Sequence, residues 1–303
     1  MGKYYEFTIY EPKERVIKAL PYIDRIVHQW YIEEFIKPYF MPKLISSTFA
    51  CLDHRGTHKA VDQIEKYMRM YKRSDGSFWI LKCDIRKFFY NIDPQVLFSI
   101  LKKSIQDKAL LKFTHLLVFD KQIPGEVGIP IGNYTSQFFA NIYLNELDQY
   151  IKRQLKVKYY VRYMDDFILL LPTKEACKIM KKKIEDFLQE SLHLQLNSKS
   201  RYYPYTMGVN FCGYRTFCTH RLLRTSSKLK IKNKIKKWNK QYHRNTLSIY
   251  PTLQSLNSWL AHSSHSCSYH LQKKVLNSCH FLYNDSFLCE SIDKLMEDSQ
   301  KVL

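Results

Sequence analysis

The chain has 303 residues, of which 45% are hydrophobic and 15% aromatic, and this composition excludes a disordered protein. No apolar run approaches the length of a membrane span, and the first residues lack the apolar segment of a secretory signal. The eight cysteines include no Cys-x-x-Cys pair. We therefore expect a folded protein of the reducing cytoplasm that has no association with membranes.

The formal net charge is +20, and the positive charge is concentrated in the C-terminal third of the chain. No Asp or Glu occurs between Ser191 and Asn284. The densest part contains ten basic residues: Arg221, Arg224, Lys228, Lys230, Lys232, Lys234, Lys236, Lys237, Lys240 and Arg244. A solvated helix face usually mixes both signs of charge, and a membrane-binding helix would need one contiguous apolar face. The pattern therefore favours nucleic acid as the partner.

The predicted elements alternate between helices and strands. Residues 1–80 are expected to be mostly helical, a strand is expected over 78–85, and Asp93-Pro94 is a helix start. The Pro- and Gly-containing stretch from Thr114 to Asn133 predicts a loop. The later expected elements are a helix over 135–155, a hairpin over 159–171, a helix over 175–190, short strands at 194–196, 209–212 and 214–217, and basic helices from 224, broken near Pro251. This order predicts an α+β architecture.

Two adjacent carboxylates occupy the predicted hairpin turn, in Tyr163-Met164-Asp165-Asp166. Like charges at a hairpin tip repel unless a cation lies between them, although Asp is also common in ordinary turns. Asp84 ends the predicted strand over 78–85, where it could equally be a strand-end cap. Three carboxylates from two strands can hold two Mg²⁺ ions about 3.5–4 Å apart, the geometry of two-metal phosphoryl transfer.

Together these residues resemble the palm of a reverse transcriptase. Asp84 with Phe88-Phe89 is similar to the motif that carries the first metal ligand, and Tyr163 to Asp166 is similar to the motif that carries the catalytic pair. Four further segments resemble reverse transcriptase motifs in the expected order: Asp24–Val27, Thr57–Ala60, Leu196–Lys199 and Phe211–Tyr214. The resemblance implies a right-hand polymerase fold in which the palm is an antiparallel sheet with packed helices.

The resemblance also implies how the chain is divided and which residues act in catalysis. The fingers would take residues 1–80, the palm 81–106 and 135–223, the connection between fingers and palm 107–134, and a basic α-helical thumb 224–303. The enzyme would be an RNA-directed DNA polymerase that uses two Mg²⁺ ions. The implied catalytic residues are Asp84, Asp165, Asp166 and Lys199, and the implied metal ligands are Asp84, Ile85, Asp165 and Asp166. Lys199 would assist departure of pyrophosphate.

The substrate contacts follow from the same resemblance. Phe89 would be a steric gate whose ring clashes with a ribose 2′-hydroxyl. The residues expected to bind the nucleotide are Arg55, Lys59, Phe89, Ile131 and Gly132, with Lys43 as a further candidate. The fingers motif departs from its relatives because Leu52 and Asp53 follow Cys51 where a basic residue is usual. The residues expected to contact nucleic acid are Phe211, Gly213, Tyr214, Arg221, Arg224, Lys228, Lys230 and Lys232.

The segment from Gly128 to Gln137 indicates which reverse transcriptase this chain resembles. Most members have Gln at the position of Ile131 and Ser-Pro at the position of Ser136-Gln137, whereas the form found here is similar to enzymes of diversity-generating retroelements. Those enzymes misincorporate opposite template adenines during mutagenic retrohoming, and loss of the Gln amide removes a hydrogen-bonding group near the nascent pair. The expected partners are a template RNA, the cDNA or primer, deoxynucleotides and a small oligomeric accessory protein. The alternatives are a retron-type or abortive-infection (phage-defence) enzyme, and a non-catalytic RNA-binding protein on the same scaffold.

Overall fold

The computed structural model describes residues 2–10, 14–119 and 127–282, which form two compact units. The first unit contains residues 1–205 and the second contains residues 206–303. The boundary therefore falls inside the segment 135–223 that the sequence assigns to the palm. No helix in the described part of the chain is long and apolar enough to cross a lipid bilayer.

The N-terminal region begins with a two-stranded antiparallel hairpin where helices were expected. Strands β1 (Tyr5–Ile9) and β2 (Arg15–Ala19) pair from Tyr5↔Ala19 to Ile9↔Arg15. The prediction was wrong here because aromatic and β-branched residues, which favour strands, make up four of the five residues of β1 and two of the five of β2. The helices that follow are α1 (Tyr22–Trp30), the π-helix η1 (Tyr31–Ile36), α2 (Lys37–Phe40), the 3-10 turn η2 (Met41–Lys43) and α3 (Thr57–Asp75).

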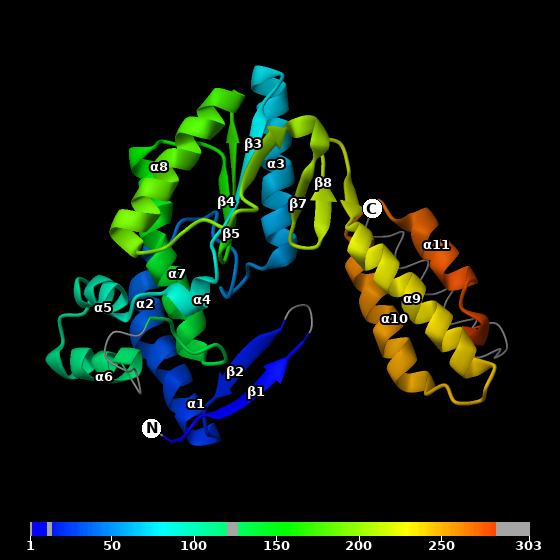
Figure 1. The fold of residues 1–303 in the computed structure, drawn as a ribbon, viewed down its shortest axis with the longest axis horizontal. Coiled ribbons are helices and arrows are strands. Elements are labelled where there is room, and N and C mark those ends of the chain that lie inside the picture. The colour runs from blue at the N-terminus through cyan, green and yellow to red at the C-terminus, as the bar shows by residue number, and fades with distance from the viewer. Residues whose placement is uncertain (1, 11–13, 120–126, 283–303) are drawn as a thin grey trace. The chain divides into compact units, whose positions relative to one another are not determined.

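A four-stranded antiparallel sheet forms the centre of the first unit (Figure 1). Its strands are β4 (Tyr160–Tyr163), β5 (Asp166–Leu171), β3 (Trp79–Asp84) and β6 (Arg201–Pro204), in that spatial order. Leu81 and Phe167 belong to the large core cluster, while their neighbours Ile80 and Ile168 are equally buried on the opposite face. Burial of both faces explains why the two central strands are continuous apolar runs rather than alternating ones.

Helices cover the sheet on both faces (Figure 1). Tyr67 and Tyr71 of α3 place their rings against Tyr159, which precedes β4, with ring centroids 5.2 Å apart in each pair. Ile184 and Leu188 of α8 (Lys174–Leu192) join the core cluster that contains Phe167. The remaining helices of this unit are α4 (Phe88–Asn91), α5 (Pro94–Lys102), α6 (Lys108–Phe119), α7 (Tyr134–Gln149), the π-helix η3 (Tyr150–Gln154) and α8 (Lys174–Leu192).

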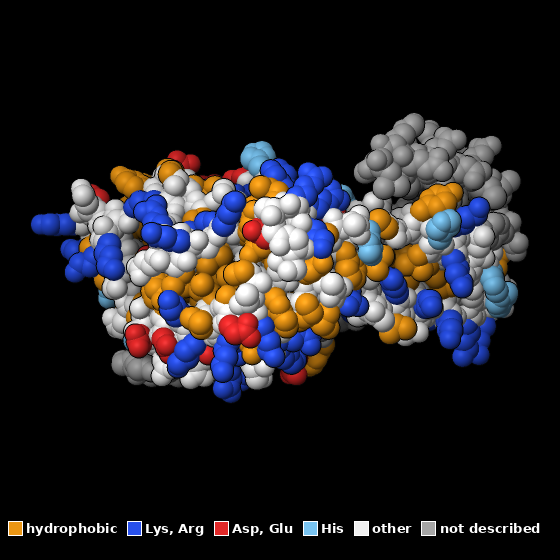
Figure 2. All heavy atoms as spheres, turned by 90° about the horizontal axis from the view of Figure 1, so that it is seen from above, with side chains coloured by type: hydrophobic (Ala, Val, Ile, Leu, Met, Phe, Trp, Pro, Cys, Tyr) orange, Lys and Arg blue, Asp and Glu red, His pale blue; other side chains and the backbone are white. Residues whose placement is uncertain are grey.

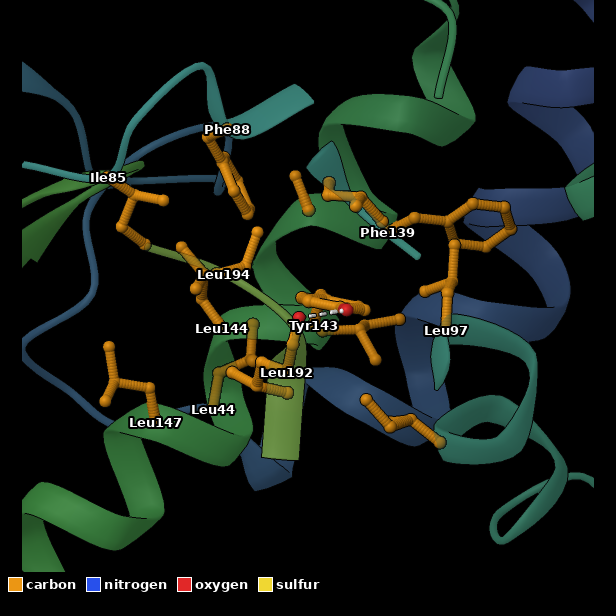
Figure 3. Close-up of a cluster of buried hydrophobic side chains, with 14 of the residues drawn as sticks. Leu44, Ile85, Phe88, Leu97, Phe139, Tyr143, Leu144, Leu147, Leu192 and Leu194 are labelled. Carbon is orange, nitrogen blue, oxygen red and sulfur yellow. Dashed lines mark hydrogen bonds between the residues drawn. The ribbon is translucent and has the colours of Figure 1, made fainter. Parts of the chain in front are cut away.

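The core of the first unit surrounds Tyr143 on α7 (Figure 3). Its hydroxyl donates a 2.7 Å hydrogen bond to the carbonyl of Leu192, so the one polar atom on this buried ring has a partner. Ile85 and Phe88 extend the same cluster to the C-terminal end of β3 (Figure 3). The residues immediately after Asp84 are therefore anchored by packing.

The second unit combines a small sheet with helices. The 3-10 turn η4 (Tyr205–Met207) links the units in sequence, and the sheet has the order β7 (Val209–Phe211), β8 (Tyr214–Thr216), β9 (Arg221–Leu223). The helical elements are α9 (Thr225–Tyr242), α10 (Ile249–Ser264), α11 (Tyr269–Asn277) and the 3-10 turn η5 (His280–Leu282). Ile231, Ile235 and Trp238 of α9 are buried in one cluster with Leu256 of α10. Because these residues face the cluster, most lysines of α9 lie on the opposite, exposed side of the helix.

Several expectations about single elements are confirmed and others are corrected. Asp93 caps α5 by accepting from the backbone N–H groups of Gln95 and Val96, and Pro94 takes the first helical position. Helix α6 occupies residues 108–119, so the loop expected from Thr114 was placed too early; residues 120–126 lie outside the described part. Residues 194–196 form only an isolated bridge from Leu196 to Ile85, and the edge strand lies instead at Arg201–Pro204. Pro251 lies in the first turn of α10 rather than at a break, and the break itself precedes Ile249.

Candidate active site

The pairing of β3 with β5 brings the predicted carboxylates to one end of the sheet. Asp84, the last residue of β3, lies directly opposite Asp166, the first residue of β5. Asp165 lies in the two-residue turn between β4 and β5, and its carbonyl accepts a 3.2 Å hydrogen bond from the N–H of Ile85. Residues 80 positions apart in the sequence are therefore assembled by backbone hydrogen bonds.

Asp84 is held by the segment that follows α8. The amide of Asn197 donates a 2.9 Å hydrogen bond to Oδ2 of Asp84, and the N–H of Asn197 donates to its carbonyl at 2.7 Å. The hydroxyl of Ser200 accepts from the N–H of Asp84 at 3.1 Å. Asn197 and Ser200 were not singled out individually by the sequence, although both lie in or beside the predicted motif Leu196–Lys199. The carboxylate of Asp84 therefore has a fixed orientation in the folded chain.

Burial and the neighbouring charge of Asp84 raise the pKa of Asp165 from 3.8 to about 6. The charge of Asp166 raises it further, whereas the guanidinium of Arg15 acts in the opposite direction. Arg15 lies on β2 and was missed by the sequence analysis, because that segment was expected to be helical. Two partly buried carboxylates that repel one another form a site at which a cation would be favourable.

Asp166 has a different environment from Asp165. Its two carboxylate oxygens lie 2.6 and 2.5 Å from the ammonium of Lys82, a residue of β3 on the same face of the sheet as Asp84. Within the described residues, no three His, Cys, Asp or Glu side chains are grouped so that they could hold a metal ion. The three-carboxylate metal group therefore stays a prediction: Lys82 pairs with Asp166 in this structure, and Asp84 and Asp165 form the pair of carboxylates whose charges repel.

These two carboxylates suit a hard divalent cation in their chemistry. Such an ion takes oxygen ligands, usually one or two carboxylates together with substrate phosphates. Ile85 could contribute only its backbone carbonyl, since its side chain is buried in the core. Asp84 and Asp165 are thus the residues that would hold the ion.

Phe89 and Ile131, predicted to contact the nucleotide, lie on two segments that are joined through the backbone. The carbonyl of Phe89 accepts from the N–H of Ile129 at 2.8 Å, and the carbonyl of Ile131 accepts from the N–H of Lys18 on β2 at 2.8 Å. Gly132 has φ +128°, and a Cβ there would lie 2.8 Å from the carbonyl oxygen of Lys18. Glycine is therefore required where the segment passes β2.

The basic residues predicted to contact the triphosphate differ from one another in their environments. Nη1 of Arg55 donates to the backbone carbonyls of Ile45 and Thr48, at 2.8 and 2.5 Å, so this guanidinium stabilises its own loop. The ammonium of Lys43 donates to the hydroxyl of Ser104 at 2.9 Å. Lys59 and Lys199 have exposed side chains. The structure thus gives Arg55 a structural task, while a contact of any of these residues with nucleotide stays a prediction.

Comparison with known proteins identifies the family. Residues 11–216 match the family model described as reverse transcriptase (RNA-dependent DNA polymerase), which is more than half of the chain. The chain belongs to the reverse transcriptase family. It is 22% identical to the COX1/OXI3 intron 2 protein of Saccharomyces cerevisiae, in a match that covers 51% of this chain and 25% of the yeast protein.

Solved telomerase structures have the same fold as this reverse transcriptase. An apo telomerase of Candida tropicalis, lacking its C-terminal domain, has a TM-score of 0.56 at 15% identity, covering 74% of this chain and 55% of that one. The telomerase of Candida albicans, in complex with a fragment of telomeric RNA, has a TM-score of 0.55 at 13% identity, covering 99% of this chain and 59% of that one. The chain thus spans little more than half the length of these telomerases. Their likeness confirms the α+β polymerase fold.

In the second unit of this reverse transcriptase, two predicted nucleic-acid contacts are buried. The rings of Phe211 and Tyr214 are inaccessible to solvent, and the Tyr214 hydroxyl donates to the carbonyl of His262 at 2.7 Å. The expectation that these rings touch nucleic acid is corrected, because each is part of the protein interior. Gly213, between them, has φ +94° in the tight connection of β7 to β8.

The basic residues of the second unit fall into two groups. Arg221, Arg224 and Lys228 are half-buried, and Nη1 of Arg221 donates to the carbonyl of His265 at 3.2 Å. Lys230 and Lys232 are exposed, as are four further lysines of α9: Lys234, Lys236, Lys237 and Lys240. Figure 2 shows the wider context, a molecular face on which Lys and Arg side chains far outnumber Asp and Glu. The exposed lysines are the part of the predicted nucleic-acid surface that solvent can reach.

Proposed function

We propose that this chain is an RNA-directed DNA polymerase that extends a DNA primer on an RNA template. The observation that carries the proposal is the pairing of β3 with β5, because it places Asp84 beside the strained turn that contains Asp165. Family membership supports the same chemistry. The second unit has no Asp or Glu between residues 206 and 284, and this basic stretch supports a polyanionic partner.

The carboxylates of Asp84 and Asp165 would hold Mg²⁺, which stabilises charge on the reacting oxygens during phosphoryl transfer when it is bound. Asn197 and Ser200 keep Asp84 oriented. Lys82 pairs with Asp166 and so reduces the repulsion among the three carboxylates. The ring of Phe89 would exclude ribonucleotides by its bulk.

Primer extension on an RNA template with Mg²⁺ and deoxynucleotides tests this function. The wild-type chain should synthesise cDNA, and Asp165→Asn should lower the rate by at least about a thousandfold, because the substitution removes a charge on which the reacting centre depends. Glu190→Gln, which changes an exposed carboxylate of α8, is the matched control and should keep the wild-type rate. Synthesis that survives Asp165→Asn would refute the site.

We further propose that the enzyme belongs to the diversity-generating type and is error-prone at template adenines. The support is the segment Gly128–Gln137, in which Ile131 replaces an amide and is tied to β2 through its carbonyl. Sequencing of cDNA made on a template with all four bases tests this assignment. Errors concentrated at adenines support it, whereas errors spread evenly over the four bases favour a retron-type or phage-defence enzyme. A small oligomeric accessory protein stays a prediction of the same resemblance.

A further inference from the structure

A completely buried ion pair lies beside the catalytic turn. The side chains of Arg162 on β4 and Asp148 on α7 are both inaccessible to solvent. Nε and Nη2 of Arg162 donate to the two oxygens of Asp148 at 2.8 and 2.6 Å, in the bidentate arrangement that guanidinium and carboxylate groups favour. Burial disfavours the charge on the guanidinium, but the charge of Asp148 outweighs it and raises the pKa of Arg162.

Asp148 is held rigidly by further donors. Its carboxylate also accepts from the hydroxyl of Thr48 at 2.9 Å and from the hydroxyl of Tyr160 at 2.7 Å. Four donor groups from three residues, which lie on two separate segments, therefore fix one carboxylate. Because Asp148 cannot rotate without breaking all of these bonds, the guanidinium that it binds has a single orientation.

The remaining nitrogen of Arg162 faces the catalytic turn. Nη1 donates to the side-chain oxygen of Asn141 at 3.2 Å and to the backbone carbonyl of Met164 at 3.2 Å. Met164 has φ 54°, a left-handed conformation that favours glycine, and it is the first of the two turn residues. The carbonyl held by Arg162 belongs to the peptide bond between Met164 and Asp165. Because the peptide bond is planar, a group that fixes this carbonyl also fixes the backbone N–H of Asp165.

We propose that Arg162 is a positioning residue for polymerisation. Asp148 fixes the guanidinium, the guanidinium holds the Met164 carbonyl in a turn that Met would not readily adopt, and the turn thereby directs the carboxylate of Asp165. Arg162 touches neither substrate nor metal in this role. The inference rests on the proposed polymerase function and goes beyond it by naming what holds the catalytic turn.

The double variant Arg162→Leu/Asp148→Asn tests the proposal. It removes both buried charges together, so neither is left unpaired, and the new amide can still bond to Thr48 and Tyr160. We expect kcat for primer extension to fall by about 30- to 100-fold while KM for the deoxynucleotide changes less than about threefold, because a small displacement of a catalytic group acts mainly on the chemical step. The proposal fails if the folded variant keeps kcat within threefold of wild type.

Methyl NMR of the metal-free protein with ¹³C-labelled methionine gives a second readout that needs no activity. The resonance of Met164, assigned with Met164→Leu, should shift or broaden in the double variant. Tyr143→Phe is the matched control, since it removes the hydrogen bonds of the Tyr143 hydroxyl with Leu192 and Asp93 in the same core but no hydrogen bond to Arg162, Asp148 or Met164. It should leave the Met164 resonance and kcat unchanged. An unshifted Met164 resonance in the double variant contradicts the proposal.

Arg162→Lys keeps the proposal falsifiable if the double variant does not fold. A lysine ammonium can pair with Asp148 but is a single point donor that cannot span Asp148 and the Met164 carbonyl as the guanidinium does. We expect a folded protein with kcat reduced about tenfold, and wild-type kcat would overturn the proposal. Failure of the function itself is distinguishable, because in that case the wild-type chain makes no cDNA.

Discussion

The two units of the chain use charge in opposite ways. In the first unit, two ion pairs near the catalytic turn, Arg162–Asp148 and Lys82–Asp166, are wholly or partly buried. In the second unit, α9 carries many exposed lysines on one side and packs its apolar side into a core. Buried charges are strongly coupled to their partners, whereas exposed charges interact weakly and are screened by salt. The contrast predicts that single substitutions dominate in the first unit and that summed charge dominates in the second.

The largest effect on nucleic-acid binding should come from removing several charges of α9 at once. Replacing Lys230, Lys232, Lys236 and Lys237 by Gln should weaken binding to an RNA–DNA duplex by about a hundredfold at 0.1 M salt and flatten its salt dependence, because fewer counterions are released. Fluorescence anisotropy at several salt concentrations measures both quantities. Any two of the four substitutions should give about half of the change in binding free energy.

The matched control for α9 replaces four exposed lysines of the first unit by Gln: Lys66, Lys102, Lys178 and Lys183. It changes the net charge equally and should have a much smaller effect on affinity. Equal losses in the two variants would show that net charge, rather than the surface of α9, governs binding. That result would remove the distinction between the two units.

The next effect concerns a single side chain of the first unit. Phe89→Ala should raise incorporation of ribonucleotides relative to deoxynucleotides by about 10- to 100-fold, because the ring that would clash with the 2′-hydroxyl is removed. Single-nucleotide extension with each sugar gives the ratio. Phe88→Leu serves as the control, since Phe88 is buried in the core and should alter stability but not sugar selection. An unchanged ratio in Phe89→Ala would refute the steric gate.

The sequence was sufficient to predict the family fold and the assembly of Asp84, Asp165 and Asp166 at one end of the sheet, because these depend on local strand patterns and motif order. It was not sufficient to predict the lysine partner of Asp166, since Lys82 is distinguished only by cross-strand register. The burial of Tyr214 and the backbone bonds of Arg55 likewise depend on tertiary contacts that no short motif records. The β1–β2 hairpin escaped prediction for a different reason: each strand has only five residues, too few for a clear alternation of apolar and polar positions.

Substitution by Asn should change the stability of the fold differently at Asp165 and at Asp166. The pKa of Asp165 is raised to about 6, so the folded chain binds more protons than the unfolded chain between about pH 4 and 6, and its stability falls as pH rises through that window. In metal-free protein, Asp165→Asn should therefore stabilise the fold by about 1–2 kcal/mol above pH 6, a value reduced for partial exposure, and by almost nothing below pH 4. Asp166→Asn leaves Lys82 without its partner and should give no such gain.

Chemical denaturation in the presence of a chelator, at pH 4 and pH 7.5, measures these differences. The comparison is internally controlled, because the two residues are adjacent and the substitution is identical. A stability gain for both variants at pH 7.5 would show that Lys82 does not neutralise Asp166. A gain for Asp165→Asn that persists at pH 4 would mean that the charge of Asp165 is not its source.

The smallest effect should be the change in fidelity at Ile131. Ile131→Gln restores an amide that can hydrogen-bond near the nascent pair, and polar contacts reject mismatched partners more strongly than apolar ones. We expect errors opposite template adenine to fall about three- to tenfold, with errors at other bases changed much less. Ile131→Leu preserves the apolar character and should keep the wild-type error spectrum. Because the backbone of Ile131 is fixed to β2, its side chain can change without moving the segment, and an error spectrum unaltered by Gln would exclude this side chain as the determinant of fidelity.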